Sequence, residues 1–456
     1  MSSNQAVRVA LLGAGERGHL MFGLFAKKHP DLFQYVAVAE SNEARRKRFV
    51  DDFNIPPDHA FADWKELLDR PQMADAVINA MPDVHHYPST ILALRQGYHV
   101  LLEKPMAQSP AQCVSLIREA KAQDRILQIF LECRYLDLYS RMKQLIDSNS
   151  IGRLMAVQTT ENLGYWHFIM SYVRGFARRS EDVISFLSAK GIHDFDLITW
   201  LTGAEPIKVS SFGELAYFKP ENAPADAPKR CLDGCSVEND CPFHAYRQYI
   251  DPGFPQMPIT LLGGVTLQAF IDGYIKYPHM RSLSAYNLTA TDKAGRIEEL
   301  RTGPHGRCVF RCDNNVMDHQ VINIEYEGGI MAMLALNAFS VTWERTMNIN
   351  GTRGEIYSKD FSGKLEVRHF WPKNKVKRSR VAFNPLFHGG SDGIVLIEFA
   401  RSVQRAHRNE QVMTAADDAL NSHLLCFAAE EARKENKVVD MVEFRERAEA
   451  DADALQ

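Results

Sequence analysis

Residues 7–18 read VRVALLGAGERG, and this stretch decides the fold of the first half of the chain. A short apolar run leads into three glycines, Gly13, Gly15 and Gly18, in the spacing G-x-G-x-x-G. Apolar residues at helical spacing follow from Leu20 to Ala26. A strand, a tight glycine turn and a helix in this order predict the first unit of a Rossmann domain.

The glycine turn and the end of the next apolar run together predict the cofactor. In such a turn the first glycine permits the sharp bend, the second lets backbone N–H groups approach a pyrophosphate, and the third allows close helix packing. The start of the helix, with Glu16 and Arg17, then faces the anion. Glu40 stands 22 residues after Gly18, where a carboxylate accepts hydrogen bonds from ribose hydroxyls and repels a 2′-phosphate. The expected cofactor is therefore NAD.

The same alternation of strand and helix continues to about residue 130. Short apolar runs separated by helical stretches are typical of parallel strands joined by crossover helices. The expected strands are Arg8–Leu12, Tyr35–Ala39, Ala76–Ala80, His99–Leu102 and Ile126–Phe130. Further covering helices are expected at Trp64–Leu68 and Thr90–Leu94. We therefore predict a doubly wound parallel α/β domain over residues 1–130.

After residue 130 the pattern changes to longer runs with period-two alternation, which is typical of an antiparallel sheet. Such runs are Leu154–Glu161, Val321–Tyr326 and Ile330–Phe339, the last two joined by Gly328 and Gly329. Residues 219–262 are expected to form a long excursion, and Ala415–Glu435 a late helix. Residues 131–456 are therefore predicted to be an α+β domain with a large, mainly antiparallel open sheet. A homodimer or homotetramer is expected, because an open sheet face needs a cover.

Composition excludes several classes of function. The chain of 456 residues is 45% hydrophobic and 24% charged, the balance of a globular protein with more than one domain. Lysine and arginine number 53 against 57 aspartate and glutamate residues, so no basic excess favours nucleic acid or an anionic membrane. The N-terminal residues lack the pattern of a secretory signal, and no apolar run reaches the roughly 18 residues of a spanning helix. A cytoplasmic enzyme is expected.

Three short motifs identify a family resemblance. The chain reads MPDVHH at 81–86, VLLEKP at 100–105 and GIHDFD at 191–196. With these motifs, and IGRL at 151–154, it closely resembles the Gfo/Idh/MocA oxidoreductases, which include glucose-fructose oxidoreductase and inositol dehydrogenase. The resemblance implies hydride transfer between a nicotinamide and a carbinol carbon of a sugar, polyol or sugar derivative. It leaves open an NAD-dependent glycoside hydrolase or lyase, and also a non-catalytic dinucleotide-binding regulator.

The resemblance also implies roles for single residues. Lys104 matches the family's E-K-P lysine, His86 matches its histidine near the nicotinamide, and His193 lies on its catalytic helix. The loops that carry them add Met81, Pro82 and Glu103 as expected cofactor contacts.

One departure from the family pattern concerns the catalytic helix. Many relatives have an aspartate four residues before the histidine, where this chain has Ala189. Lys190, three residues before His193, shares that helix face and is expected to supply the polar group. The hydroxyl proton is therefore expected to pass to Lys104, or to the pair Lys190 and His193.

Substrate contacts are expected from a group of aromatic, basic and acidic residues near the catalytic helix and from one later loop. Aromatic rings and arginines in one segment suit stacking on a sugar and bonding to its hydroxyls, although core aromatics beside solvated arginines give the same pattern. His388 precedes two glycines that let backbone approach a ligand, although a simple helix-capping loop also fits. The expected contacts are Tyr165, His167, Arg174, Arg178, Asp194 and His388.

Five of the eight cysteines form two groups. Cys231, Cys235 and Cys241 stand in C-x3-C-x5-C, and Cys308 and Cys312 in C-x3-C. Four cysteine thiolates can hold a structural zinc ion, and a smaller number can be ligands of an iron–sulfur cluster. The spacing in this chain differs from the usual C-x2-C of a zinc knuckle. The spacing favours buried thiols or a disulfide, so the sequence by itself assigns no metal ligand.

Overall fold

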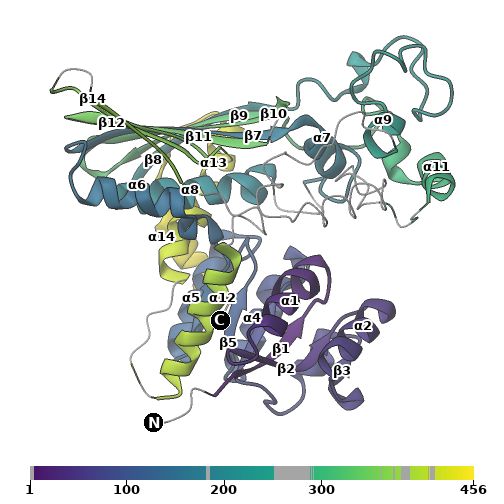
Figure 1. The fold of residues 1–456 in the computed structure, drawn as a ribbon, viewed down its shortest axis with the longest axis vertical. Coiled ribbons are helices and arrows are strands. Elements are labelled where there is room, and N and C mark those ends of the chain that lie inside the picture. Colours follow the sequence, from purple (N-terminus) through teal and green to yellow (C-terminus); the bar gives the residue numbers. More distant parts are fainter. Residues whose placement is uncertain are drawn as a thin grey trace.

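The computed structural model describes residues 5–180, 185–250, 288, 290, 292–341, 343–360, 362–372, 375–381, 391–408, 410 and 416–455. Two separate sheets organise this part of the chain. Figure 1 shows the smaller sheet, with the purple N-terminal strands, below the larger one. None of the helices described here has the length and apolar character that crossing a membrane requires.

The smaller sheet is a six-stranded parallel sheet in the order β3-β2-β1-β4-β5-β6. This is the strand order of the doubly wound dinucleotide-binding fold, and the predicted Rossmann domain is confirmed. Its strands are almost continuously apolar because both faces are covered. They are β1 (Val7–Leu12), β2 (Phe33–Ala39), β3 (Ala60–Phe61), β4 (Ala76–Asn79), β5 (His99–Leu102) and β6 (Leu127–Ile129).

The helices of this domain begin where their capping residues predict. Asn42 accepts a hydrogen bond from the backbone N–H of Arg45, and Ser109 one from that of Gln112, with Pro110 in the first turn. The helix after the glycine turn begins directly after Gly15, four residues earlier than the apolar spacing indicates. The helices are η1 (Glu16–Gly23), α1 (Leu24–Lys28), α2 (Glu43–Phe53), η2 (Pro57–His59), α3 (Trp64–Leu68), η3 (Asp83–His85), α4 (His86–Arg95) and α5 (Pro110–Ala122).

Helix α12 (Ser391–Ala406) belongs to the second half of the sequence but packs on the first sheet. Its buried residues Val395 and Phe399 share one apolar core with Leu11 of β1 and with Phe130. In Figure 1 this yellow-green helix runs beside the small sheet. The boundary expected near residue 130 therefore does not separate the hydrophobic cores completely, because α12 from the second half of the sequence packs into the core of the first domain.

The larger sheet has nine strands in the order β14-β13-β12-β11-β7-β10-β9-β8-β15. All neighbouring strands are antiparallel except β10 and β7, so the predicted mainly antiparallel sheet is confirmed. Gly328 and Gly329 make the turn between β9 and β10 with φ angles of 72° and 75°. The strands are β7 (Leu154–Gly164), β8 (Pro206–Glu214), β9 (His319–Tyr326), β10 (Ile330–Ser340), β11 (Glu344–Gly351), β12 (Gly354–Lys359), β13 (Lys364–His369), β14 (Lys375–Arg380) and β15 (Val439–Asp440).

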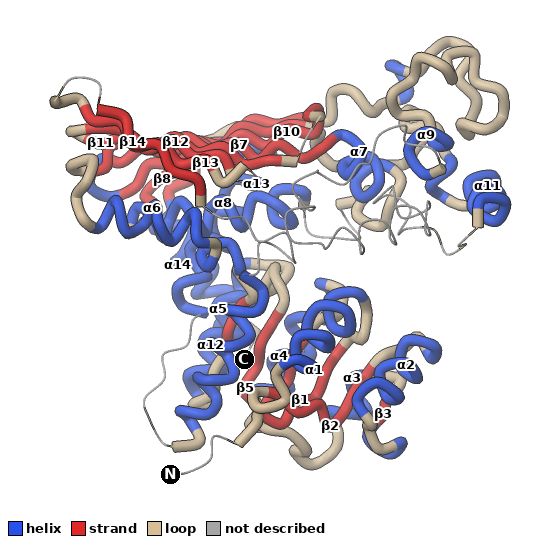
Figure 2. Tube along the Cα trace, viewed as in Figure 1, coloured by secondary structure: helices blue, strands red, loops and turns tan. Residues whose placement is uncertain are grey.

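Helices cover one face of this sheet, as Figure 2 shows by its blue helices beneath the red strands. They are α6 (Asp137–Asp147), α8 (Ile192–Thr202), α13 (Ala416–Glu435) and α14 (Met441–Asp453). Along β9, Ile322 and Ile324 are buried under these helices while Val321 is exposed on the opposite face. No helix of the described residues covers that opposite face.

Short helices connect the sheet to a lobe at its end. The excursion predicted at 219–262 is described up to residue 250, and it is mostly loop. The short helices are η4 (Glu132–Tyr135), α7 (Tyr165–Phe168), η5 (Ile169–Val173), η6 (Leu187–Gly191), η7 (Pro220–Asn222), α9 (Ala245–Tyr249), α11 (Lys293–Thr302), η12 (Pro304–Gly306) and η13 (Glu327–Gly329).

Candidate active site

The predicted cofactor residues lie along one edge of the small sheet. Gly13 follows β1, Glu40 follows β2, Met81 lies just after β4, and Glu103 and Lys104 follow β5. Because parallel strands end at the same edge, their loops come together there, where ligands bind in open α/β sheets.

The glycine turn has the shape of a phosphate cradle. Gly13 has a φ angle of 89°, and a Cβ atom built there would lie 2.8 Å from the carbonyl oxygen of Ala80. A Cβ atom at Gly18 would lie 2.0 Å from the carbonyl oxygen of Gly13. At Gly15 the nearest atom is Nη1 of Arg45, 4.0 Å away, so this side of the turn is open. The turn therefore fits a pyrophosphate at the start of η1, whereas the side chain of Glu16 lies outside the described part of the structure.

Glu40 is fixed beside this turn. Its carboxylate accepts hydrogen bonds from the backbone N–H groups of Ala14, at 2.8 Å, and Asn42, at 2.9 Å. Arg46 donates to the carbonyl oxygen of Glu40 at 2.6 Å. A buried negative charge thus stands next to the cradle, in the position that the sequence predicts.

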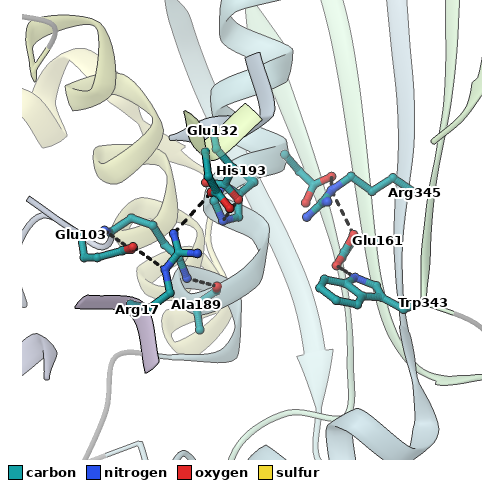
Figure 3. Close-up of polar contacts among 11 residues, drawn as sticks. Arg17, Glu103, Glu132, Glu161, Ala189, His193, Trp343 and Arg345 are labelled. Carbon is teal, nitrogen blue, oxygen red and sulfur yellow. Dashed lines mark hydrogen bonds and ion pairs between the residues drawn. The ribbon is translucent and has the colours of Figure 1, made fainter. Parts of the chain in front are cut away.

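Arg17 and Glu103, both expected to contact the cofactor, contact each other. Arg17 Nε lies 2.6 Å from Glu103 Oε1, and its Nη2 lies 3.7 Å from Asp392 Oδ1 on α12. Burial by itself lowers the pKa of Arg17, but the carboxylates of Glu103 and Asp392 raise it overall, so the guanidinium stays charged. This pair ties the glycine turn to the E-K-P loop (Figure 3).

Two buried histidines hold the E-K-P loop. His86 is 1% exposed, and its ring nitrogens lie 2.6 Å from the Pro105 carbonyl oxygen and 2.9 Å from that of Met81. His423 on α13 accepts a hydrogen bond from the Met106 N–H at 2.8 Å, and burial lowers the pKa of His423 to about 4, which suits a neutral acceptor. His86, which the sequence places near the nicotinamide, thus uses both ring nitrogens to position the loops at the cofactor edge.

Two lysines meet where the domains adjoin. Lys104 donates from Nζ to the carbonyl oxygen of Ala189 at 2.9 Å (Figure 3). The next residue, Lys190, places its Nζ 4.9 Å from the ring centroid of Trp343. Burial, and then the charge of Lys104, lower the pKa of Lys190 to about 7. A lysine with a pKa lowered in this way can act as a base near neutral pH.

His193 stands beside an acid that the sequence analysis missed. His193 Nε2 lies 3.8 Å from Glu132 Oε1, and both side chains are buried. Glu132 comes shortly after β6, so the same rule about carboxyl ends of parallel strands was the signal that would have found it. His193 and Glu132 thus form a second buried pair of titratable groups in this region.

Glu132, His193 and Cys133 also have the residue types of a metal site, since their ligand atoms lie within 4.8 Å of one another. Two cationic groups, Arg17 and Lys190, already act on Glu132. These charges disfavour a further cation, and we assign the group to acid–base chemistry.

A buried ionic network supports this region from the large sheet. Arg345 Nε on β11 lies 3.0 Å from Glu161 Oε2 and 3.1 Å from Asp194 Oδ1, and Trp343 donates to Glu161 at 2.9 Å. Burial by itself lowers the pKa of Arg345, but Asp194 and Glu161 raise it well above its ordinary value. Because Asp194 follows His193 and Trp343 faces Lys190, the network fixes the surroundings of both proton-handling groups.

The residues expected to bind substrate differ in their burial and in the groups that they contact. His167 packs edge-on against Trp343, with ring centroids 5.2 Å apart, and burial and Lys190 lower its pKa well below the ordinary value. Tyr165 is half-buried against Phe243, and Arg178 pairs with Asp313 at 2.9 Å. The structure corrects the expectation for Arg174 and Asp194, which are fully buried and bonded to protein groups. His388 lies outside the described residues.

Comparison with known proteins agrees with this geometry. Residues 7–131 match the model of an oxidoreductase family with an NAD-binding Rossmann fold, and residues 139–245 match the GFO/IDH/MocA C-terminal domain. Together the two matches cover just over half of the chain.

Individual relatives are distant. YteT of Bacillus subtilis (strain 168), itself only provisionally named an oxidoreductase, is 24% identical over 372 residues, 77% of each chain. Several other curated relatives match over about a third to a half of their own length. A scyllo-inositol dehydrogenase from Lactobacillus casei, solved with NAD(H) and scyllo-inositol, superposes with a TM-score of 0.61 at 17% identity over 96% of this chain and all of its own. A levoglucosan dehydrogenase in complex with NADH and levoglucosan gives 0.64 at 15% identity over the same shares.

Proposed function

This chain belongs to the Gfo/Idh/MocA family of oxidoreductases, and from that premise we propose that it is an NAD-dependent dehydrogenase of a sugar, polyol or sugar derivative. The observation that carries the proposal is the lysine pair. Lys104 comes from the cofactor edge of the Rossmann sheet and bonds to the backbone beside Lys190, which comes from the second domain. A substrate hydroxyl held between the domains meets both amines.

The cofactor is held by the groups already described: the open turn at Gly15, the start of η1, Glu40 and the E-K-P loop. When bound, a nicotinamide supplies the acceptor for the hydride that leaves the carbinol carbon. The chain itself handles the proton. Lys190 Nζ, whose pKa lies near 7, accepts the hydroxyl proton, while the Lys104 ammonium donates a hydrogen bond to the developing alkoxide.

A polyhydroxylated ring is the substrate class that these surroundings favour. Trp343 and His167 offer aromatic faces, which stack on the apolar faces of sugar rings. His193 and Glu132 are positioned to bond a second hydroxyl. Inositol and levoglucosan, the ligands named for two proteins of the same fold, are cyclic polyols or sugar derivatives of this kind.

A panel of aldoses, inositols and anhydrosugars, each incubated with NAD and monitored by NADH absorbance, tests the proposal. A substrate that produces NADH in proportion to its own oxidation supports a dehydrogenase. Release of aglycone from glycosides without net NADH would support the redox-assisted hydrolase or lyase in its place. Tight dinucleotide binding with no turnover of any compound would support the non-catalytic regulator.

Cofactor preference gives the first quantitative prediction. Glu40 is a buried carboxylate beside the cradle. It repels the 2′-phosphate of NADP, because like charges at a desolvated contact repel strongly. NAD is therefore expected to bind at least about tenfold more tightly than NADP. Isothermal titration calorimetry of both dinucleotides measures this. Glu40→Gln is expected to reduce the difference between the NAD and NADP affinities. Equal affinities in the natural chain would mean that attraction of the 2′-phosphate by the nearby Arg45 and Arg46 exceeds its repulsion by Glu40.

The second prediction concerns pH. Lys190 is a base only when neutral, and its pKa is lowered to about 7, so kcat/KM for oxidation is expected to rise as pH increases through about 7. Lys190→Met is expected to remove this inflection and leave a slower, flatter profile. Lys121→Met, which alters an exposed lysine of α5, serves as the matched control. An unchanged inflection in Lys190→Met would assign the titration to another group.

The third prediction concerns assembly. Apolar side chains are exposed on the bare face of the large sheet, including Phe212 at 67% and Met331 at 52%, with Val321 paired in register to Phe212. A second copy covering this face is the simple way to bury them, so light scattering at micromolar concentration is expected to give a homodimer or homotetramer. Phe212→Glu is expected to yield smaller species, whereas Val442→Glu on α14 is not. A monomeric natural chain would contradict the prediction.

A further inference from the structure

Five cysteines gather in the lobe at the end of the large sheet, outside the chemistry proposed above. Arg230 and Arg307 form an antiparallel bridge, and the Cys231 N–H bonds to the Gly306 carbonyl at 2.9 Å. The Cys308 N–H bonds to the Lys229 carbonyl, also at 2.9 Å. Two cysteine groups about 70 residues apart in sequence are therefore held side by side in the lobe that Figure 1 shows around α9 and α11.

The sulfur atoms share a common neighbour. The Arg174 guanidinium lies 3.3 Å from Cys231 Sγ and acts electrostatically on the thiols of Cys308, Cys312 and Cys241 as well. All five cysteines are free thiols, and no three of their sulfur atoms lie within 4.8 Å of one another. Side-chain rotation is therefore needed before these four sulfurs can share one ligand.

Arg174 is a buried cation whose bonded partners, among the described residues, include no carboxylate. The side chain is fully buried, and its bonded partners are the carbonyl oxygens of Arg307 and Phe243, Oε1 of Gln248 and Sγ of Cys231. None of these four partners is a carboxylate. A buried cation is costly unless an opposite charge accompanies it. The acidic groups of the described residues that act most strongly on this guanidinium are the thiols of Cys231, Cys308 and Cys312 and the phenol of Tyr249. Because a thiol is ordinarily more acidic than a phenol, the sulfur atoms are the groups that a bound metal ion would convert to the opposing charge.

The lobe has a small hydrophobic core of its own among the described residues. That apolar cluster contains five buried residues, and a core of this size gives little stability by itself. Cys231 is one of the five. A metal held by side chains from both cysteine groups would close a long loop, which is how small lobes with insufficient cores are commonly stabilised.

We propose that Cys231, Cys241, Cys308 and Cys312 bind one structural zinc ion, with Arg174 as the buried counter-charge. Four thiols lose their protons and form four Zn–S bonds of about 2.3 Å, which gives a tetrahedral site with a net charge of −2. The positive guanidinium at 3.3 Å from Cys231 Sγ offsets part of that charge. Cys235 is half-buried and interacts with the Cys241 thiol, and we leave it outside the proposed set of ligands.

Metal analysis of the full chain tests this. Plasma mass spectrometry is expected to find one zinc ion per chain, and cobalt replacing zinc is expected to give the visible absorption of a tetrahedral thiolate site. Cys231→Ser and Cys308→Ser are expected to lose the zinc, while Cys235→Ser and Cys426→Ser, a buried cysteine of α13, retain it. Arg174→Gln is expected to weaken zinc retention against a chelator by about tenfold to a hundredfold, the usual effect of losing a neighbour that supports metal ligands.

A measurement on the natural chain keeps the test independent of how the variants fold. Mercurial titration of the thiols, followed with a zinc-sensitive dye, is expected to release one zinc ion as four thiols react. A chain that contains no zinc after incubation with the ion overturns the proposal. So does a disulfide within the cluster found by peptide mass spectrometry, an iron–sulfur chromophore, or zinc retained by both Cys231→Ser and Cys308→Ser.

Discussion

Lys104→Met is expected to lower kcat/KM for substrate oxidation by about a hundredfold or more, the usual scale for losing a group that handles the proton in the transition state. The substitution removes the ammonium that bonds to Ala189 at 2.9 Å and the positive charge that helps to lower the pKa of Lys190. Without that charge the pKa of Lys190 rises, so less of the neutral base is present at pH 7. The loss is expected in kcat, measured under saturating NAD.

Two further measurements separate this role from a structural one. NAD affinity in Lys104→Met is expected to stay near that of the natural chain, because the cradle and Glu40 are untouched, and the inflection of the remaining rate is expected to move to higher pH. His193→Ala is expected to act in the same sense but more mildly, since Lys190 shares its task. Near-native turnover by Lys104→Met would contradict the catalytic role assigned to the whole E-K-P motif.

Arg345→Met is expected to lower the free energy of unfolding by about 3–5 kcal/mol, the range for removing one partner of a buried ion pair. The guanidinium is the shared cation of Glu161 and Asp194, and both carboxylates are fully buried. Methionine leaves them without a counter-charge. Urea unfolding followed by tryptophan fluorescence measures the loss. Arg368→Met, which removes half-exposed ion pairs, is the matched control and is expected to lower the free energy of unfolding far less.

The pH dependence of this loss identifies its cause. Burial raises the pKa of Asp194, and losing the Arg345 charge is expected to raise it further. The folded variant therefore binds a proton more readily than the unfolded chain, and its loss of stability becomes smaller as pH falls. The deficit is therefore expected to be smaller at pH 5 than at pH 8. Adding Glu161→Gln is expected to recover part of the stability, because the amide still accepts the Trp343 hydrogen bond. A deficit that does not change with pH would indicate lost packing in place of unpaired charge.

Much of the candidate site was readable from local sequence because short motifs carry their own geometry. The three glycines, Glu40 and Lys104 each follow an apolar strand, and parallel strands bring such positions to one edge. Glu132 obeys the same rule and was missed only because it belongs to no familiar motif. Trp343 and Arg345 gave no local signal, since they lie on strands of the large sheet and meet Lys190 and Asp194 only through packing.

The sequence by itself determined the two sheets, the glycine turn with Glu40 after the next strand, and the candidate residues for proton transfer. Each of these follows from spacing within one element or from residues next to it. Only the tertiary structure decided which groups meet. It showed that His86 and Arg174 bond to protein groups, lowered the pKa of Lys190 through burial and Lys104, and brought α12 onto the Rossmann sheet. The physical reason is that desolvation and charge pairing act between side chains distant in sequence, and no local pattern records which of them folding brings within a few ångströms.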